Sequence, residues 1–137
     1  MSESAADAAQ RLLDRAERGE LAALCERERI DLFVLFGSAG RSESNPRDID
    51  VAVRFAENTR GDVLSLLDGL YQLTRYEGFD VLDLRRAGPV ARDRALSEGR
   101  PLYQARPGLY GNAQIAAMME RMETREFRRV QLELLSR

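Results

Sequence analysis

The sequence lacks several residue types on which enzymes and secreted proteins commonly depend. It contains no histidine and no tryptophan, and Cys25 is its only cysteine. The absence of histidine excludes Ser-His-Asp and Cys-His catalysis and zinc sites built on imidazole. A single cysteine excludes an internal disulfide bond and a thiolate metal cage. Any proton transfer by this chain must therefore use carboxylates, tyrosines, basic side chains or the substrate itself.

The sequence also lacks long apolar runs and a strong excess of either charge. No run approaches the roughly 20 apolar residues that cross a bilayer, and residues 1–7 lack the basic-then-apolar pattern of a signal peptide. We therefore expect a soluble cytoplasmic protein without membrane contact. The formal net charge is −2 and the sequence pI is about 5.3. This balance argues against a broad nucleic-acid-binding surface, so no direct nucleic-acid binding is expected.

Helix-like and strand-like segments alternate along the 137 residues, which predicts an α/β (α+β) fold. Strands are predicted at residues 30–36, 48–55, 79–84 and 101–103. Helices are predicted near residues 4–18, 20–28, 61–75 and 89–98, followed by a long helix from Gly108 almost to the end. Asn58 or Thr59 is expected to cap the helix near 61–75.

Two carboxylates stand two residues apart at the head of the second predicted strand. Because strand side chains alternate between faces, Asp48 and Asp50 point the same way. Two carboxylates side by side repel each other unless a cation lies between them, and Mg²⁺ suits oxygen ligands of this kind. The turn Gly37-Ser38 ends the preceding strand, and a small turn lets backbone N–H groups approach a phosphate closely. Together these features indicate nucleotidyl transfer.

A third carboxylate from the next strand would complete a site for two metal ions. Asp80 and Asp83 are the candidates, and they face opposite ways because they are three residues apart. Only one of them can therefore join Asp48 and Asp50. Asp80 is favoured because it lies at the start of the strand, which leaves Asp83 for a structural or edge contact.

The pattern of these residues resembles the minimal nucleotidyltransferase (MNT) family, within the DNA polymerase β-like nucleotidyltransferase superfamily. The resemblance is carried by Gly37-Ser38, the nine residues that follow, the Asp48-x-Asp50 pair, Arg41, and the segments 79–84 and 97–103. It covers roughly residues 20–104. It implies a small mixed sheet flanked by helices, a nucleotidyltransferase domain over residues 1–104, and a C-terminal helical extension over residues 105–137.

The resemblance also implies an activity, because stand-alone MNT proteins of this size are typically antitoxins of HEPN–MNT toxin–antitoxin pairs. The implied reaction transfers AMP from ATP to a tyrosine hydroxyl of the HEPN toxin, an RNase, and so silences it. Asp48, Asp50 and Asp80 would then be the catalytic and metal-binding residues for two Mg²⁺ ions. Gly37 and Ser38 would cradle the phosphates of ATP, and Arg41 would offset charge on the departing pyrophosphate.

Other interpretations stay open. The protein can be a catalytically silent antitoxin that masks its toxin, although masking alone has no need for the three aspartates. It can also act on a small molecule, but such enzymes usually carry a second domain for which this chain is too short. In the C-terminal helix, Met118, Met119 and Met122 are expected to pack in the core or to form an interface, either in a homodimer or with the toxin.

Overall fold

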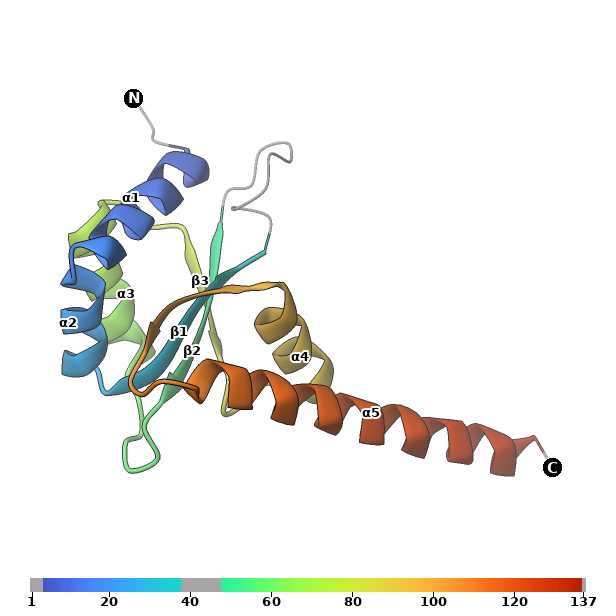
Figure 1. The fold of residues 1–137 in the computed structure, drawn as a ribbon. Helices are drawn as coiled ribbons and strands as arrows, with labels where there is room; N and C mark the ends of the chain where they lie inside the picture. The colour runs from blue at the N-terminus through green and yellow to red at the C-terminus, as the bar shows by residue number, and fades with distance from the viewer. Residues whose placement is uncertain (1–3, 38–47, 137) are drawn as a thin grey trace.

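The computed structural model describes residues 4–37 and 48–136. In those residues the elements are α1 (Ala5–Glu17), α2 (Glu20–Arg27), β1 (Ile30–Phe36), β2 (Ile49–Phe55), α3 (Val63–Thr74), β3 (Phe79–Asp83), α4 (Pro89–Glu98), β4 (Arg100–Gln104) and α5 (Leu109–Leu135). Every strand and helix predicted above is present, with ends that differ by a few residues. Figure 1 shows their arrangement.

The four strands form one sheet in the order β3-β2-β1-β4. β1 pairs antiparallel with both β2 and β4, whereas β2 and β3 run parallel. The parallel pair requires a crossover, and α3 provides it. The sheet is therefore mixed, and the predicted α/β (α+β) class is confirmed.

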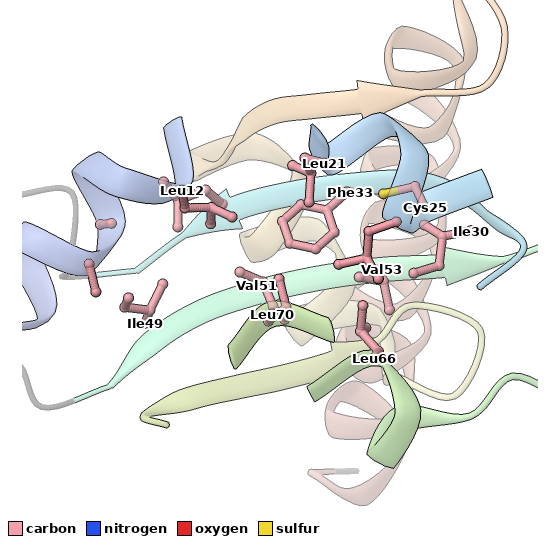
Figure 2. Packing of buried hydrophobic residues seen from close by; sticks show 14 of the residues in the cluster. Leu12, Leu21, Cys25, Ile30, Phe33, Ile49, Val51, Val53, Leu66 and Leu70 are labelled. Atoms are coloured by element: carbon pink, nitrogen blue, oxygen red, sulfur yellow. The ribbon is translucent and has the colours of Figure 1, made fainter. Parts of the chain in front are cut away.

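Helices cover both faces of the sheet, and each face has its own apolar core. The larger core lies between the sheet and α1, α2 and α3 (Figure 2). Its central side chains include Leu12, Phe33, Val51, Val53 and Leu70, all fully buried. The smaller core lies on the opposite face, where α4 and α5 pack on Leu32, Val34 and Ala52. Because neighbouring residues of β2 alternate between the two cores, the strand is buried on both faces.

Capping explains where the helices begin. The Ser4 hydroxyl oxygen accepts a hydrogen bond from the Asp7 backbone N–H at the start of α1. At α3 the cap is Asp62, whose Oδ1 accepts from the Ser65 backbone N–H at 3.0 Å. The expectation that Asn58 or Thr59 caps this helix is therefore wrong. The preceding loop is held by Arg85, whose guanidinium donates to the carbonyl oxygens of Ala56 and Thr59, and the helix starts only after that loop.

α5 lies only partly on the domain. Its 27 residues make a helix about 40 Å long at about 1.5 Å per residue, and its C-terminal half extends well past the rest of the molecule (Figure 1). Its buried residues, Leu109 and Ala117, lie in the N-terminal third. Met118, Met119 and Met122 are 50–59% exposed. The core-packing interpretation of these methionines is therefore wrong.

Polar contacts fasten the inner part of α5 to α4. Tyr110 Oη lies 2.6 Å from the carbonyl oxygen of Leu96, and Gln114 Nε2 donates to the same oxygen at 2.9 Å. Farther along, Arg121 pairs with Asp93 at 2.7 Å. In the part of the chain that the structure describes, no helix is long and apolar enough to cross a membrane.

Candidate active site

The acidic residues gather where β2 and β3 begin. Asp50 pairs in register with Asp80 on the parallel neighbour β3, and with Phe36 on the antiparallel neighbour β1. Paired residues on adjacent strands point to the same face, and Asp48 lies two positions before Asp50. This face is the one covered farther along by α4 and α5, because Ala52 belongs to the smaller core. The structure therefore brings Asp50 and Asp80 side by side, with Asp48 at the same edge.

The electrostatics of Asp50 reflect this gathering. Partial burial of the carboxyl group raises the pKa of Asp50, and the nearby carboxylates of Asp80 and Asp48 raise it further. Arg94 acts in the opposite direction and lowers that pKa. Carboxylates that lie close together repel one another when they are ionised. A cation bound between them removes this repulsion, so such a cluster favours cation binding.

Gly37 contacts this carboxylate from the end of β1. Its φ is +84°, a left-handed conformation that glycine adopts readily. A Cβ atom on Gly37 would lie 2.1 Å from Oδ2 of Asp50, so a side chain there would displace this carboxylate. The glycine of the predicted Gly-Ser turn is therefore needed both for its backbone conformation and for the space that Asp50 occupies. Ser38 and Arg41, the other two predicted nucleotide-binding residues, lie outside the described residues.

Asp83 occupies the opposite face of β3 and has a local role. Its carboxylate oxygens lie 4.0 Å from Arg85 and 3.9 Å from Arg86. Its Oδ1 also accepts a hydrogen bond of 3.0 Å from the Arg85 backbone N–H. These contacts hold the turn that follows β3. Side chains of a strand alternate between its two faces, and the two aspartates of β3 follow this rule: Asp80 lies beside Asp50, whereas Asp83 lies on the other face.

Arg94 is a candidate that the sequence reasoning missed. It lies on α4, exposed, and pairs with Glu98 at 3.4 Å, one turn along the same helix. Its effect on the pKa of Asp50 places its positive charge near the acidic cluster. The signal available in the sequence was its position on the helix that directly follows the strand carrying Asp80. No feature of the sequence alone separates it from Arg92, which instead donates to the carbonyl oxygens of Leu84 and Ala87.

The donor set fits Mg²⁺ held jointly with a substrate. Asp48, Asp50 and Asp80 offer only carboxylate oxygens, and a divalent cation would relieve their mutual repulsion at Asp50. Among the described residues, no three acidic or cysteine side chains form a group that could hold a metal ion by themselves. Mg²⁺ commonly binds through one or two carboxylates plus phosphate oxygens, so such a protein cage is not required.

Comparisons with known proteins bear on the family and the fold of the chain. The family described as Polymerase beta, Nucleotidyltransferase matches residues 20–107. No curated protein sequence matches the chain significantly. Among solved structures, the fold is similar to a tri-AMPylated Shewanella oneidensis HEPN toxin in complex with MNT antitoxin. That match has 19% identity and a TM-score of 0.64, and it covers 91% of this chain and 99% of the other.

Two further structures have the same fold. A toxin–antitoxin complex with AMP-PNP matches at 19% identity and a TM-score of 0.62, covering 85% of this chain and 96% of the other. The toxin–antitoxin MntA-HepT matches at 19% identity and a TM-score of 0.64, covering 90% and 99%. At these identities the likeness establishes the fold, and the likeness extends over nearly the whole length of each solved chain.

Proposed function

This chain belongs to the polymerase beta nucleotidyltransferase family, and from that membership we propose that it transfers AMP from ATP to a tyrosine hydroxyl of a HEPN toxin. The observation that carries the proposal is the register of Asp50 with Asp80 beside Gly37. Similar folds occur in an AMPylated HEPN toxin complex and in a toxin–antitoxin complex with AMP-PNP, which supports both the nucleotide and the partner. The function proposed is that of an antitoxin in the cytoplasm.

The residues at the head of the sheet would bind and orient the nucleotide. Gly37 and Ser38 carry no large side chain, so their backbone N–H groups would approach the triphosphate closely. Arg41 and Arg94 would offset the negative charge of the phosphates, Arg94 from the side of α4. Two Mg²⁺ ions held by Asp48, Asp50 and Asp80 would supply positive charge to the phosphate oxygens. Without such compensation the three carboxylates repel a triphosphate.

In the transfer step, the tyrosine oxygen of the toxin attacks the α-phosphorus of ATP. A new oxygen–phosphorus bond forms, the bond between the α-phosphorus and the bridging oxygen breaks, and pyrophosphate leaves. A carboxylate oxygen of Asp80 would accept the hydroxyl proton, because Asp80 is the most exposed partner of the in-register pair and the chain has no histidine for that task. The products are the AMP ester of tyrosine and pyrophosphate.

The intact mass of the toxin tests this proposal. We expect incubation of the two proteins with ATP and MgCl₂ to add one or more AMP units to the toxin. The matched control is the double variant Asp48→Asn/Asp50→Asn, which keeps the shape of both side chains and removes their charges. Transfer that survives in the double variant would contradict the metal-binding roles.

The same experiment distinguishes AMP transfer from the alternative function, in which the antitoxin inhibits its toxin only by binding to it. A stable complex with no added mass, by size-exclusion chromatography, would indicate an antitoxin that acts by covering its toxin. Replacing the acceptor tyrosine of the toxin by phenylalanine distinguishes tyrosine from another acceptor. We expect that change to abolish the mass increase while leaving the complex intact.

A further inference from the structure

A second concave site lies at the opposite end of the sheet from the aspartates. It is a pocket of about 590 Å³ lined by residues from the start of β1, the end of β2 and the loop that precedes α3. Figure 1 shows that these three segments lie at one end of the sheet. Arg29, Arg54, Arg85 and Arg106 line it, from segments that are far apart in the sequence. Arg54 is four residues beyond Asp50 on the same face of β2, which at about 3.3 Å per residue separates them by about 13 Å. The pocket is therefore separate from the candidate active site.

The side chains of three of these arginines have no partner in residues 4–37 and 48–136. Arg85 donates to carbonyl oxygens of the loop before α3 and stacks on Phe55, so its charge is used to hold that loop. In contrast, the guanidinium groups of Arg29, Arg54 and Arg106 form no hydrogen bond or ion pair with the residues that the structure describes. In a chain with a net charge of −2, unpaired arginines that share one pocket repel each other, and an anion would relieve that repulsion.

The backbone is irregular at the same place. Arg29 has φ +57°, a left-handed conformation that costs a residue with a side chain of order 1 kcal/mol or more. Its carbonyl oxygen accepts a hydrogen bond of 2.8 Å from Ala56, which ties the start of β1 to the end of β2. One residue on, the register of β1 against β2 shifts between Ile30 and Leu32, so Asp31 lies in a bulge. Bulges and strained residues are frequent where side chains are aimed at ligands.

The lining also contains two acidic side chains, Asp31 and Glu57. Neither forms an ion pair with an arginine within the described ranges 4–37 and 48–136. A surface that follows a nucleic-acid backbone is positively charged along its length, and interspersed carboxylates disfavour such binding. A small ligand with a phosphate at one end and hydroxyl or amino donors at the other suits both groups. The guanidinium groups match phosphate geometry, and the carboxylates accept from the donors.

We propose that this pocket binds a small phosphate ester of the nucleotide class through Arg29, Arg54 and Arg106, with Asp31 and Glu57 receiving its hydrogen-bond donors. The volume lies within the range of small-molecule sites, about 300–1,000 Å³. Arg54 and Arg106 also line an adjoining pocket of about 330 Å³ that borders α5, which gives a longer ligand room to extend. This site goes beyond the transfer reaction proposed above and does not depend on it.

Calorimetric titration of the full chain with AMP, in buffer containing EDTA, tests the proposal. Withholding divalent metal suppresses AMP binding at Asp48, Asp50 and Asp80. The Asp50→Asn variant identifies any AMP binding that remains at that site. We expect AMP to bind, Arg54→Gln and Arg106→Gln each to weaken binding at least 10-fold, and Asp50→Asn to leave it unchanged. Arg125→Gln is the matched control, because Arg125 is exposed on the outer part of α5, away from the pocket. It should bind AMP as the unchanged chain does.

Arg29→Gly separates a binding role from a structural one. Glycine relieves the left-handed backbone, so this variant should melt at a higher temperature while it binds AMP more weakly. The proposal is overturned if AMP does not bind, or if Arg125→Gln or Asp50→Asn weakens binding as much as the pocket variants do. It is also overturned if inorganic phosphate binds as tightly as AMP, which would indicate an adventitious ion only. The proposal is likewise overturned if the chain binds RNA oligonucleotides with an affinity that rises with their length and is lost in Arg106→Gln. That result would indicate that the pocket is part of a nucleic-acid-binding surface.

Discussion

Asp50 is partly buried beside two other carboxylates, and the fold gains nothing from its charge. Because its pKa in the folded protein is raised above the ordinary value, ionisation of Asp50 opposes folding. This cost is fully present above the folded-state pKa, fades as the pH falls through that value, and is absent below the unfolded-state pKa. Under the proposed function, Asp50 is therefore a residue at which activity and stability conflict.

Asp50→Asn should consequently raise stability and remove activity together. At pH 7 without metal we expect a melting temperature higher by roughly 1–3 °C, a small gain because the cluster is open to water. The difference from the unchanged protein should narrow as the pH is lowered toward 4. MgCl₂ should stabilise the unchanged protein more than the variant. Thermal melts at several pH values, with and without MgCl₂, provide the measurement, and a variant that melts lower at pH 7 would refute the argument.

Asp80 and Asp83 offer a matched pair on one strand, since both can receive the same change. Asp80 is exposed and makes no ion pair with the described residues, whereas Asp83 holds the turn to α4. Asp80→Asn should lower the rate of AMP transfer by about 10²–10⁴-fold, as expected for loss of a general base, with little change in stability. Asp83→Asn should keep the rate and cost about 1 kcal/mol of unfolding free energy.

The rates of AMP addition to the toxin and the chemical denaturation curves of both variants are the required measurements. If Asp83→Asn loses transfer and Asp80→Asn keeps it, the assignment of the third carboxylate is reversed. If both lose transfer while remaining folded, the turn after β3 contributes to the site as well.

The placement of a site residue could be predicted from the sequence where it depends only on the residue's position within its own strand. The spacing of Asp48 and Asp50 gives their common face, and the period of two distinguishes Asp80 from Asp83. The space that Gly37 leaves for Asp50 and the position of Arg94 depend on packing between segments that the sequence does not show to be adjacent. The three arginines of the second pocket were unpredictable for the same reason.

Local sequence patterns were sufficient to predict which helices and strands exist along the chain and which of the two types each one is. Strongly apolar β-branched and aromatic runs predict β1 and β2, and helical spacing of leucines predicts α3. The prediction of the α3 N-cap was wrong because hydrogen bonds from Arg85 fix the loop before the helix, and the helix then begins after Asp62. Arg85 is 23 positions after Asp62 in the sequence. A contact over that distance is invisible to a rule that considers only neighbouring residues.

The attachment of α5 to α4 makes a further prediction at this scale. Tyr110 Oη and Gln114 Nε2 both contact the carbonyl oxygen of Leu96, and Tyr110 Oη also lies 3.2 Å from that of Gly99. Tyr110→Phe should cost about 1 kcal/mol, because Gln114 still satisfies Leu96. Tyr110→Phe combined with Gln114→Leu should cost more than the sum of the single changes. Urea denaturation of the two single variants and the double variant measures this, and strict additivity would show that the two side chains act independently.

For the whole molecule, the outer part of α5 is the least explained feature. Large apolar side chains are exposed along it: Ile115, Met118, Met119, Met122, Phe127, Val130, Leu132, Leu134 and Leu135. Scattered apolar residues are normal on a surface, but a concentration on one protruding helix is typical of an interface. The expected division into residues 1–104 and 105–137 remains a prediction, and so does a homodimer through this helix.

We expect this helix to contact the toxin in the proposed antitoxin complex, and Met119→Glu/Met122→Glu tests that expectation. Both methionines are more than half exposed, so the double change should leave the melting temperature within about 2 °C of the original. Two charges buried without partners at an interface should weaken the complex at least 10-fold. Size-exclusion chromatography with light scattering, applied to the chain alone and with the toxin, reads out both assemblies. Met119→Gln/Met122→Gln is the uncharged control and should weaken the complex less. If the variant remains bound to the toxin but the chain alone changes from dimer to monomer, the helix joins two copies of this chain instead.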